Sequence, residues 1–121
     1  MSEYLIISNT NEMVRFATES MVYVASYGNY SDIYTRDGKS HTVTLQLGDI
    51  EDLIDEQLEL AGEDFMRIGK CLIVNLCFVT YIHPANKQIV LSDNHTFKYN
   101  LEASKEALRN LKEYLEKKKN K

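Results

Sequence analysis

The sequence predicts a mostly β protein, with short antiparallel strands in small packed sheets, one central helix and one C-terminal helix. Three observations support this fold class. Short runs of β-branched and aromatic residues recur between turns rich in Gly, Asn, Asp and Ser. Apolar residues adopt a helical spacing in only two segments, 48–60 and 103–118. A length of 121 residues, 44% of them hydrophobic, fits a single domain over 1–121.

The first half of the chain supplies five expected strands and the central helix. The strands are expected over residues 4–7, 13–16, 21–25, 32–36 and 39–45. The polar segment 26–31 contains Gly28-Asn29, a hairpin signal because both residues tolerate positive φ. The helix over 48–60 carries acids in its first turn, where the helix dipole favours anions, and Gly62 is expected to end it.

The apolar stretch from Phe65 to Ile82, FMRIGKCLIVNLCFVTYI, organises the rest of the chain. Its composition predicts two strands of a buried sheet that meet at a polar bend. Arg67 and Lys70 flank Gly69 at this bend, where Gly permits positive φ or close approach of a partner. A rigid sheet edge that carries cations and an exposed backbone is suited to hold a phosphate.

Two further strands and a helix complete the chain. Strands are expected over 88–91 and 96–100, which brings the total to nine. The C-terminal helix is expected from about Ala103 to Lys118, with an apolar stripe on one face and a basic tail over 117–121.

Charge is unevenly distributed along the chain. Residues 1–65 contain 3 basic and 13 acidic side chains, a net charge of −10, whereas residues 66–121 contain 11 basic and 5 acidic ones, a net charge of +6. Segment 49–64 has eight acids and no base, and we interpret it as an outer face that repels DNA. The tail contributes much of the positive charge, so the placement of individual cations matters more than the total.

Several classes of protein are disfavoured by the sequence. The N-terminus has an acid and a short apolar run where a signal peptide would be basic and longer, which predicts a cytoplasmic protein that does not enter a membrane. Cys71 and Cys77 are expected to be reduced thiols in the core. The His and Cys residues lack metal-ligand spacing, and the sequence shows no motif of a catalytic or cofactor site. We therefore expect no enzyme activity, no metal, no cofactor and no small-molecule substrate.

Four segments resemble the LytTR DNA-binding domain of bacterial transcription regulators: MVYVASYGNYSDIYTRDG, QLGDIEDLI, FMRIGKCLIVN and IVLSDNHTFKYNLEASKEAL. The resemblance covers residues 13 to 111 in the family order. It implies a β fold whose loops enter successive major grooves of double-stranded DNA, with a homodimer on DNA as one mode of binding. The chain resembles only the output domain of response regulators, without a receiver domain, so we expect a stand-alone regulator.

The resemblance assigns three DNA-facing loops. Asn29-Tyr30-Ser31 matches the first loop, residues 67–70 match the second, and residues 98–102 match the third. Gly69 replaces a His that is common in the family, and Glu102 stands near a common Arg, so two of three base contacts are altered. The candidate DNA-binding residues are Asn29, Tyr30, Ser31, Lys39, Arg67, Gly69, Lys70, Lys98, Asn100, Ser104 and Lys105.

Each candidate also has a purely structural interpretation. Arg67 and Lys70 can be solvated surface cations, Tyr30 can pack as a cross-strand aromatic residue, and Ser104 can cap the last helix. Asn75 is expected to form a bend and not to contact DNA. The sequence thus favours a sequence-specific DNA-binding transcription regulator, with a LytTR-like protein-interaction module that lacks base contacts as the alternative.

Overall fold

The computed structural model describes residues 3–118, with ten strands where the sequence predicted nine. The strands are β1 (Tyr4–Ser8), β2 (Met13–Ala17), β3 (Met21–Tyr27), β4 (Tyr30–Thr35), β5 (Ser40–Val43), β6 (Phe65–Ile68), β7 (Leu72–Asn75), β8 (Val79–His83), β9 (Gln88–Ser92) and β10 (Lys98–Glu102). The α-helices are α1 (Leu47–Gln57) and α2 (Lys105–Lys118). Four 3-10 turns are η1 (Thr18–Ser20), η2 (Ala61–Asp64), η3 (Leu76–Phe78) and η4 (Pro84–Asn86). Residues 119–121 of the expected basic tail lie outside the described residues.

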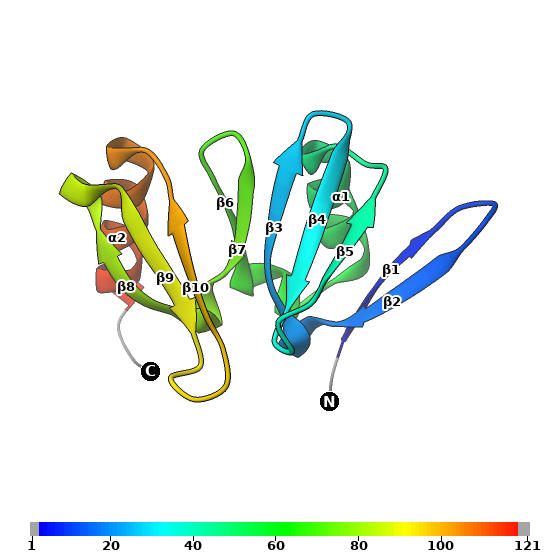
Figure 1. Ribbon diagram of the computed structural model, residues 1–121, viewed down its shortest axis with the longest axis horizontal. Helices are drawn as coiled ribbons and strands as arrows, with labels where there is room; N and C mark the ends of the chain where they lie inside the picture. The colour runs from blue at the N-terminus through cyan, green and yellow to red at the C-terminus, as the bar shows by residue number, and fades with distance from the viewer. Residues whose placement is uncertain (1–2, 119–121) are drawn as a thin grey trace.

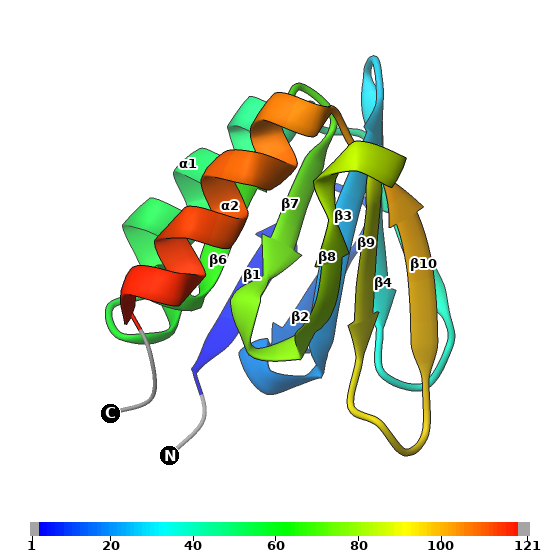
Figure 2. The same cartoon turned by 90° about the vertical axis from the view of Figure 1, so that its left-hand side faces the viewer.

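The strands form three antiparallel sheets. A five-stranded sheet has the order β5-β4-β3-β7-β6, a three-stranded sheet has the order β10-β9-β8, and a two-stranded sheet consists of β1 and β2. Figure 1 shows α2 and the three-stranded sheet at one end of the long axis and the β1–β2 hairpin at the other. Figure 2 shows both α-helices on the same side of the two larger sheets. The expected fold class, mostly β with one central and one C-terminal helix, is confirmed.

The two helices bury apolar stripes against two separate cores. Leu47, Ile50 and Ile54 of α1 pack into a cluster with the inner face of the hairpin and one face of β3 and β4. Leu108 and Leu111 of α2 pack into a second cluster with β7 and β9. Burying a large aliphatic side chain stabilises the fold by about 1.5–3 kcal/mol. These two contacts determine where the helices lie.

Helix α1 is shorter than the sequence predicted. It ends at Gln57, not near Leu60, and Leu58 takes an extended conformation, with φ −108° and ψ 131°. The Gln57 amide donates to the Ile6 carbonyl at 2.9 Å and accepts from the Ile6 N–H at 2.8 Å. This contact satisfies backbone groups at the edge of β1 that faces away from β2. Gly62 lies farther along the chain, in η2, and so does not end the helix as predicted.

The central stretch contains three strands, so the prediction of two is wrong. Asn75 ends β7, and η3 redirects the chain from the five-stranded sheet into β8 of the three-stranded sheet. The buried Asn75 side chain donates to the Met21 carbonyl at 2.8 Å and accepts from the Cys77 N–H at 3.0 Å. Its expected role as a bend-forming residue is confirmed. The predicted burial of the cysteines is wrong, because Cys71 lies in the β6–β7 turn and Cys77 in η3, where both are exposed.

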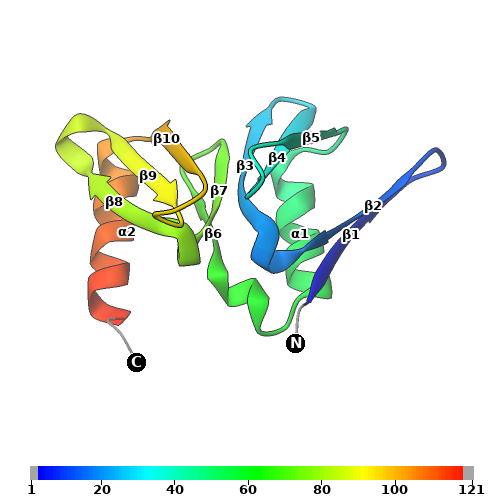
Figure 3. The same ribbon diagram turned by 60° about the horizontal axis from the view of Figure 1, so that its bottom comes forward.

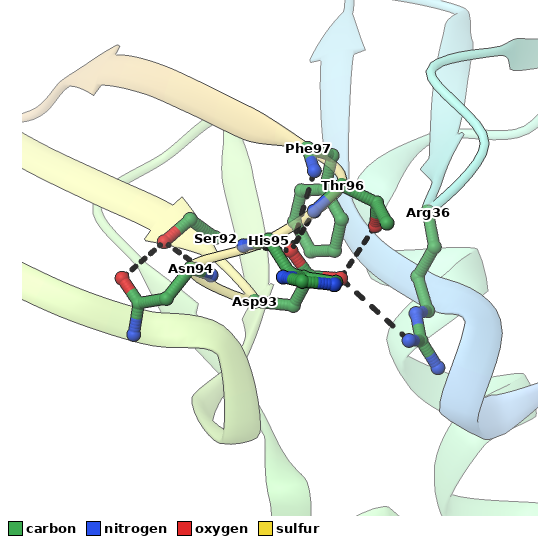
Figure 4. Close-up of polar contacts among 7 residues, drawn as sticks. All are labelled: Arg36, Ser92, Asp93, Asn94, His95, Thr96 and Phe97. Atoms are coloured by element: carbon green, nitrogen blue, oxygen red, sulfur yellow. Dashed lines mark hydrogen bonds and ion pairs between the residues drawn. The ribbon is translucent and has the colours of Figure 1, made fainter.

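A turn around Asp93 joins the two larger sheets (Figure 4). One carboxylate oxygen accepts the backbone N–H groups of His95, Thr96 and Phe97 at 2.9, 2.7 and 3.2 Å. The other oxygen accepts the Thr96 hydroxyl and lies 3.7 Å from the Arg36 guanidinium, which follows β4. The Thr96 hydroxyl, and then these N–H groups, lower the pKa of Asp93 well below its usual value.

This network predicts a specific pH dependence of stability. Since the folded-state pKa of Asp93 is lowered, its contribution is fully present above the unfolded-state pKa of about 4 and is lost as pH falls toward the folded-state pKa. We expect Asp93→Asn to lower the melting temperature at neutral pH and to narrow its gap to the wild type as pH falls below about 4. Thermal unfolding followed by circular dichroism across this range measures the gap. A constant gap at every pH would contradict an ionised role for Asp93.

Candidate nucleic-acid interface

Four connections between elements lie at one end of the molecule. In an antiparallel sheet successive strands run in opposite directions, so every second connection returns to the same end. Figure 1 shows the β3–β4 turn, the β6–β7 turn, η4 and the junction between β10 and α2 together at the upper edge. We define the tip surface as residues 28–30, 69–71, 84–87 and 102–105. It contains parts of all three loops that the sequence predicted to face DNA.

Backbone and side-chain hydrogen bonds connect the tip surface to its neighbours. The Gln46 side-chain amide donates to Oδ1 of the Asn29 side chain at 3.3 Å, next to the start of α1. The Cys71 carbonyl accepts the Ser26 N–H at 2.9 Å, which ties the β6–β7 turn to β3. The second and third loops are adjacent, because Gly69 and Ser104 both line a depression of ≈470 Å³ between β6 and α2. Separate parts of the chain therefore present their turns as one surface.

The first turn consists of only two residues, Gly28 and Asn29, with Gly28 at φ +74°. Tyr30 is the first residue of β4 and is 54% exposed. Tyr27 is its direct partner on β3 and is 59% exposed. The cross-strand arrangement expected for Tyr30 thus leaves both rings in solvent at the tip. Sequence reasoning missed Tyr27, although the two-residue turn predicts it as the partner of Tyr30.

Ser31 is not available at the tip surface. Its side chain is fully buried, and its hydroxyl donates to the Leu45 carbonyl at 2.8 Å. Side chains alternate between the two faces of a strand, so Ser31 points away from the face that exposes Tyr30. We therefore correct its assignment from DNA contact to structural residue.

The second turn places one free cation and one engaged cation side by side. Gly69 has φ +65°, and the exposed Lys70 follows it at the apex. Arg67 lies on β6, where its guanidinium contacts the Glu51 carboxylate at 3.2 Å and donates to the Lys70 carbonyl at 3.3 Å. Lys70 is thus the cation at this turn that projects without an acidic partner among the contacts described for it, whereas Arg67 is partly neutralised.

The residues of the third predicted loop lie at both ends of β10, and those after its C-terminal end lie at the tip surface. Ser104 caps α2 by accepting the Ala107 N–H at 3.1 Å, as its structural interpretation predicted. Lys105 is the first residue of α2 and is exposed at the tip surface. Glu102 ends β10 beside them and is also exposed. The N-terminus of α2 and Lys105 therefore favour an anion here, and Glu102 opposes it.

Lys39 and Lys98 do not lie at the tip surface. Lys39 follows the β4–β5 turn, and Lys98 pairs with Ser92 next to the β9–β10 turn. Both turns lie at the opposite end of the molecule in Figure 1. Asn100 lies midway along β10, exposed in a broad depression that it shares with Lys98. The candidate DNA-binding residues therefore do not share one surface, because Lys39 and Lys98 lie at the opposite end from Lys70 and Lys105.

Lys87 is a tip-surface cation that sequence reasoning missed. It follows η4 in a left-handed conformation, with φ 58° and ψ 35°, and is exposed. Its carbonyl accepts the Ala103 N–H at 3.1 Å, which places it beside the junction that carries Lys105. Residues 83–87 form the turn that joins β8 to β9. Counting strand directions would have put this turn at the same end as the β6–β7 turn.

The acidic helix is not turned wholly away from the tip surface. Helix α1 begins at the same end, where Asp49 accepts the Gln46 N–H at 3.2 Å in a capping box. Glu51 reaches Arg67, as described above. The negative charge of α1 therefore borders the interface at its first turns, and this part of the expectation is wrong.

Because carboxylates of α1 border the tip surface, we expect that removing one of them strengthens DNA binding. Arg67 and Glu51 are 36% and 42% exposed, and such a pair contributes only about 0–1 kcal/mol to stability. We expect Glu51→Gln to release Arg67 and to raise affinity for duplex DNA roughly two- to fivefold at low salt. Fluorescence anisotropy with a labelled duplex measures the change. Asp55→Asn removes an equal charge from the same helix, and an equal gain in that variant would contradict a local role for Glu51.

Within residues 3–118, no group of three or more His, Cys, Asp or Glu side chains could hold a metal ion. In the same part of the chain, no helix has both the length and the apolar character that crossing a bilayer requires.

Comparisons with known proteins identify relatives of this arrangement. Residues 11–116 match the family model described as the LytTr DNA-binding domain. Among solved structures, the chain is similar to the LytTr DNA-binding domain of a protein described as a methyl-accepting/DNA response regulator from Bacillus cereus. That match has a TM-score of 0.61 and 16% sequence identity, and covers 92% of this chain and 94% of the other. Among curated proteins, none matches this chain.

Proposed function

Since the chain belongs to the LytTr family of DNA-binding domains, we propose that it regulates transcription in the cytoplasm by docking its tip surface on double-stranded DNA. The observation that carries this proposal is the convergence of separate turns, with exposed Asn29, Lys70 and Lys105, at one end of the molecule. Turns that project from the end of a rigid sheet can enter grooves without a change in the fold.

Lysines of the tip surface supply phosphate contacts in this proposal. Lys70, Lys87 and Lys105 come from three different connections and are all exposed. Contacts to phosphate position a protein on the duplex without reading sequence, and they account for half or more of protein–DNA hydrogen bonds. Lys39 and Lys98 are outside this set because their turns lie at the opposite end.

Base contacts in this proposal come mainly from the first turn. The Asn29 amide can pair with an adenine edge in the major groove, and exposed Tyr27 and Tyr30 flank it. Gly69 offers no side chain, and Glu102 could accept only from a cytosine amino group. We therefore propose sequence-specific binding with fewer base contacts than a family member that has His and Arg at those positions. Each bidentate contact contributes about 1–3 kcal/mol of discrimination against the wrong base.

A salt titration tests the proposed function. Binding of a labelled random duplex should weaken as salt rises, with a log–log slope of about −3 if three lysines neutralise three phosphates. A selection from random duplexes then tests whether a preferred sequence emerges. Absence of binding at low salt would overturn the proposal and leave the interaction module without base contacts.

A further inference from the structure

Lys98 and Asn100, which the tip surface leaves out, lie on the outer face of the three-stranded sheet. Tyr99 and Leu101 of β10 pack into the core with α2, so their neighbours Lys98 and Asn100 point to the opposite face. Figures 2 and 3 show α2 on one side of this sheet. The opposite face holds a depression of ≈830 Å³, lined by β8, β9, β10 and the β9–β10 turn. This volume lies within the range of about 300–1,000 Å³ that is typical of small-molecule sites.

Strand pairing brings three exposed side chains of this face within reach of one small molecule. Tyr81 on β8 pairs with Val90 on β9, which pairs with Asn100 on β10, so the three share one row. Lys98 lies one row farther from the tip surface, opposite Ser92. Adjacent strands are about 4.8 Å apart and alternate residues of a strand about 7 Å apart, so the row and Lys98 span about 10 by 7 Å. Val90, only 7% exposed, forms the floor between them.

The polar groups of these three side chains are available to a ligand. Tyr81 is 48% exposed, and Lys98 and Asn100 are exposed as well. Within residues 3–118, no hydrogen bond or ion pair is described for the side-chain polar atoms of the three. By contrast, the hydroxyls of Thr80 and Ser92, which also line the depression, lie 3.1 Å apart and bond to each other. The depression thus combines satisfied hydroxyls with three side chains whose partners must come from solvent or a ligand.

The charge within the depression favours an anion. Its basic lining residues are Lys98 and His95, and in the described part of the chain no Asp or Glu lines it. Two nearby acids are placed elsewhere, since Asp93 accepts the N–H groups of its own turn and Glu102 ends β10 at the tip surface. A phosphate can therefore bind at Lys98 through a charge-assisted hydrogen bond.

We propose that this depression binds an adenine nucleotide, with the base on the Tyr81 ring and the phosphate at Lys98. An exposed aromatic ring on a sheet is a stacking platform for a base, and the Asn100 amide can pair with the adenine edge. No sequence motif marks the site, because its residues come from three strands. None of these three residues belongs to the tip surface, so the inference does not rest on the DNA-binding proposal. The same chemistry accommodates a free mononucleotide or one nucleotide of a single strand.

Isothermal titration calorimetry with adenosine monophosphate at low salt tests the site. The wild type should bind one equivalent, Tyr81→Ala should bind about fivefold or more weakly, and Lys98→Gln should bind about tenfold more weakly. Adenosine and inorganic phosphate, as separate probes, should each bind at least about tenfold more weakly than the nucleotide. Amide chemical-shift changes on nucleotide binding should centre on β8, β9 and β10 and not on the tip surface.

Tyr114→Ala and Lys112→Gln are the matched controls, since both residues are exposed on α2 and neither lines the depression. Both variants should bind the nucleotide as the wild type does. Absence of binding at millimolar nucleotide, equal binding of inorganic phosphate, or equal losses in the controls would overturn the proposal. A tetranucleotide of deoxyadenosine distinguishes the two sources: tighter binding than the monophosphate identifies a single strand, and equal or weaker binding identifies the free nucleotide. Circular dichroism checks that each variant is folded.

Discussion

Replacing Lys70 by Glu should weaken binding to every duplex by about tenfold to thirtyfold, whatever its sequence. Lys70 lies at the apex of the β6–β7 turn, and the positive φ of Gly69 sets the course of the backbone there. The substitution removes one phosphate contact and places a repelling charge at the tip surface. The log–log salt slope should also fall in magnitude by about one. Anisotropy titrations of two unrelated duplexes at several salt concentrations measure both effects.

Lys39→Glu is the matched control for this prediction. It changes the net charge by the same amount, but Lys39 follows a turn at the opposite end of the molecule. Charges farther apart than the Debye length of about 10 Å are largely screened, so the control should bind within about twofold of the wild type. Equal losses in the two variants would show that net charge, and not the tip surface, governs binding.

Asn75→Ala should lower the free energy of unfolding by about 2–3 kcal/mol. The Asn75 side chain is buried and bonded both to the Met21 carbonyl and to the Cys77 N–H, where the chain crosses between sheets. Alanine would leave the Met21 carbonyl without its partner in a buried site, which is costly, and would also remove the acceptor of the partly buried Cys77 N–H. Urea unfolding followed by circular dichroism measures the loss.

The exposed Asn86 in η4 offers a control for the same type of substitution. Asn86→Ala should change the free energy of unfolding by less than about 0.5 kcal/mol, since it removes no buried partner. Asn75→Ala should retain duplex affinity under conditions where it is folded, because Asn75 lies outside the tip surface. A stability change near zero in Asn75→Ala would contradict the bend-forming role that we assign to this residue.

Local patterns were sufficient to predict the type and order of most elements. The glycines at the β3–β4 and β6–β7 turns have the positive φ that their positions predicted. The apolar spacing predicted both helices, although α1 ends earlier because Gln57 binds the backbone of β1, 51 residues away. The count of strands failed at η3, since an apolar run gives no sign of where the chain changes sheets.

The candidate site was predicted only in part, because its members depend on contacts between distant segments. The alternation of strand direction separates Lys39 and Lys98 from Lys70 and Lys105, and it adds Lys87. Exposure was equally difficult to predict. The burial of Ser31 follows from its hydrogen bond to Leu45, 14 residues away, and the exposure of both cysteines follows from their positions in turns.

The sequence by itself determined the class of fold, the family and the turns that can reach a ligand, because hydrophobic periodicity and turn chemistry act over a few residues. Only the tertiary structure decided which turns share an end, which cation is neutralised by an acid, and which polar side chain is buried. Those properties arise from the pairing of strands that are far apart in the chain, as when Arg67 on β6 meets Glu51 on α1.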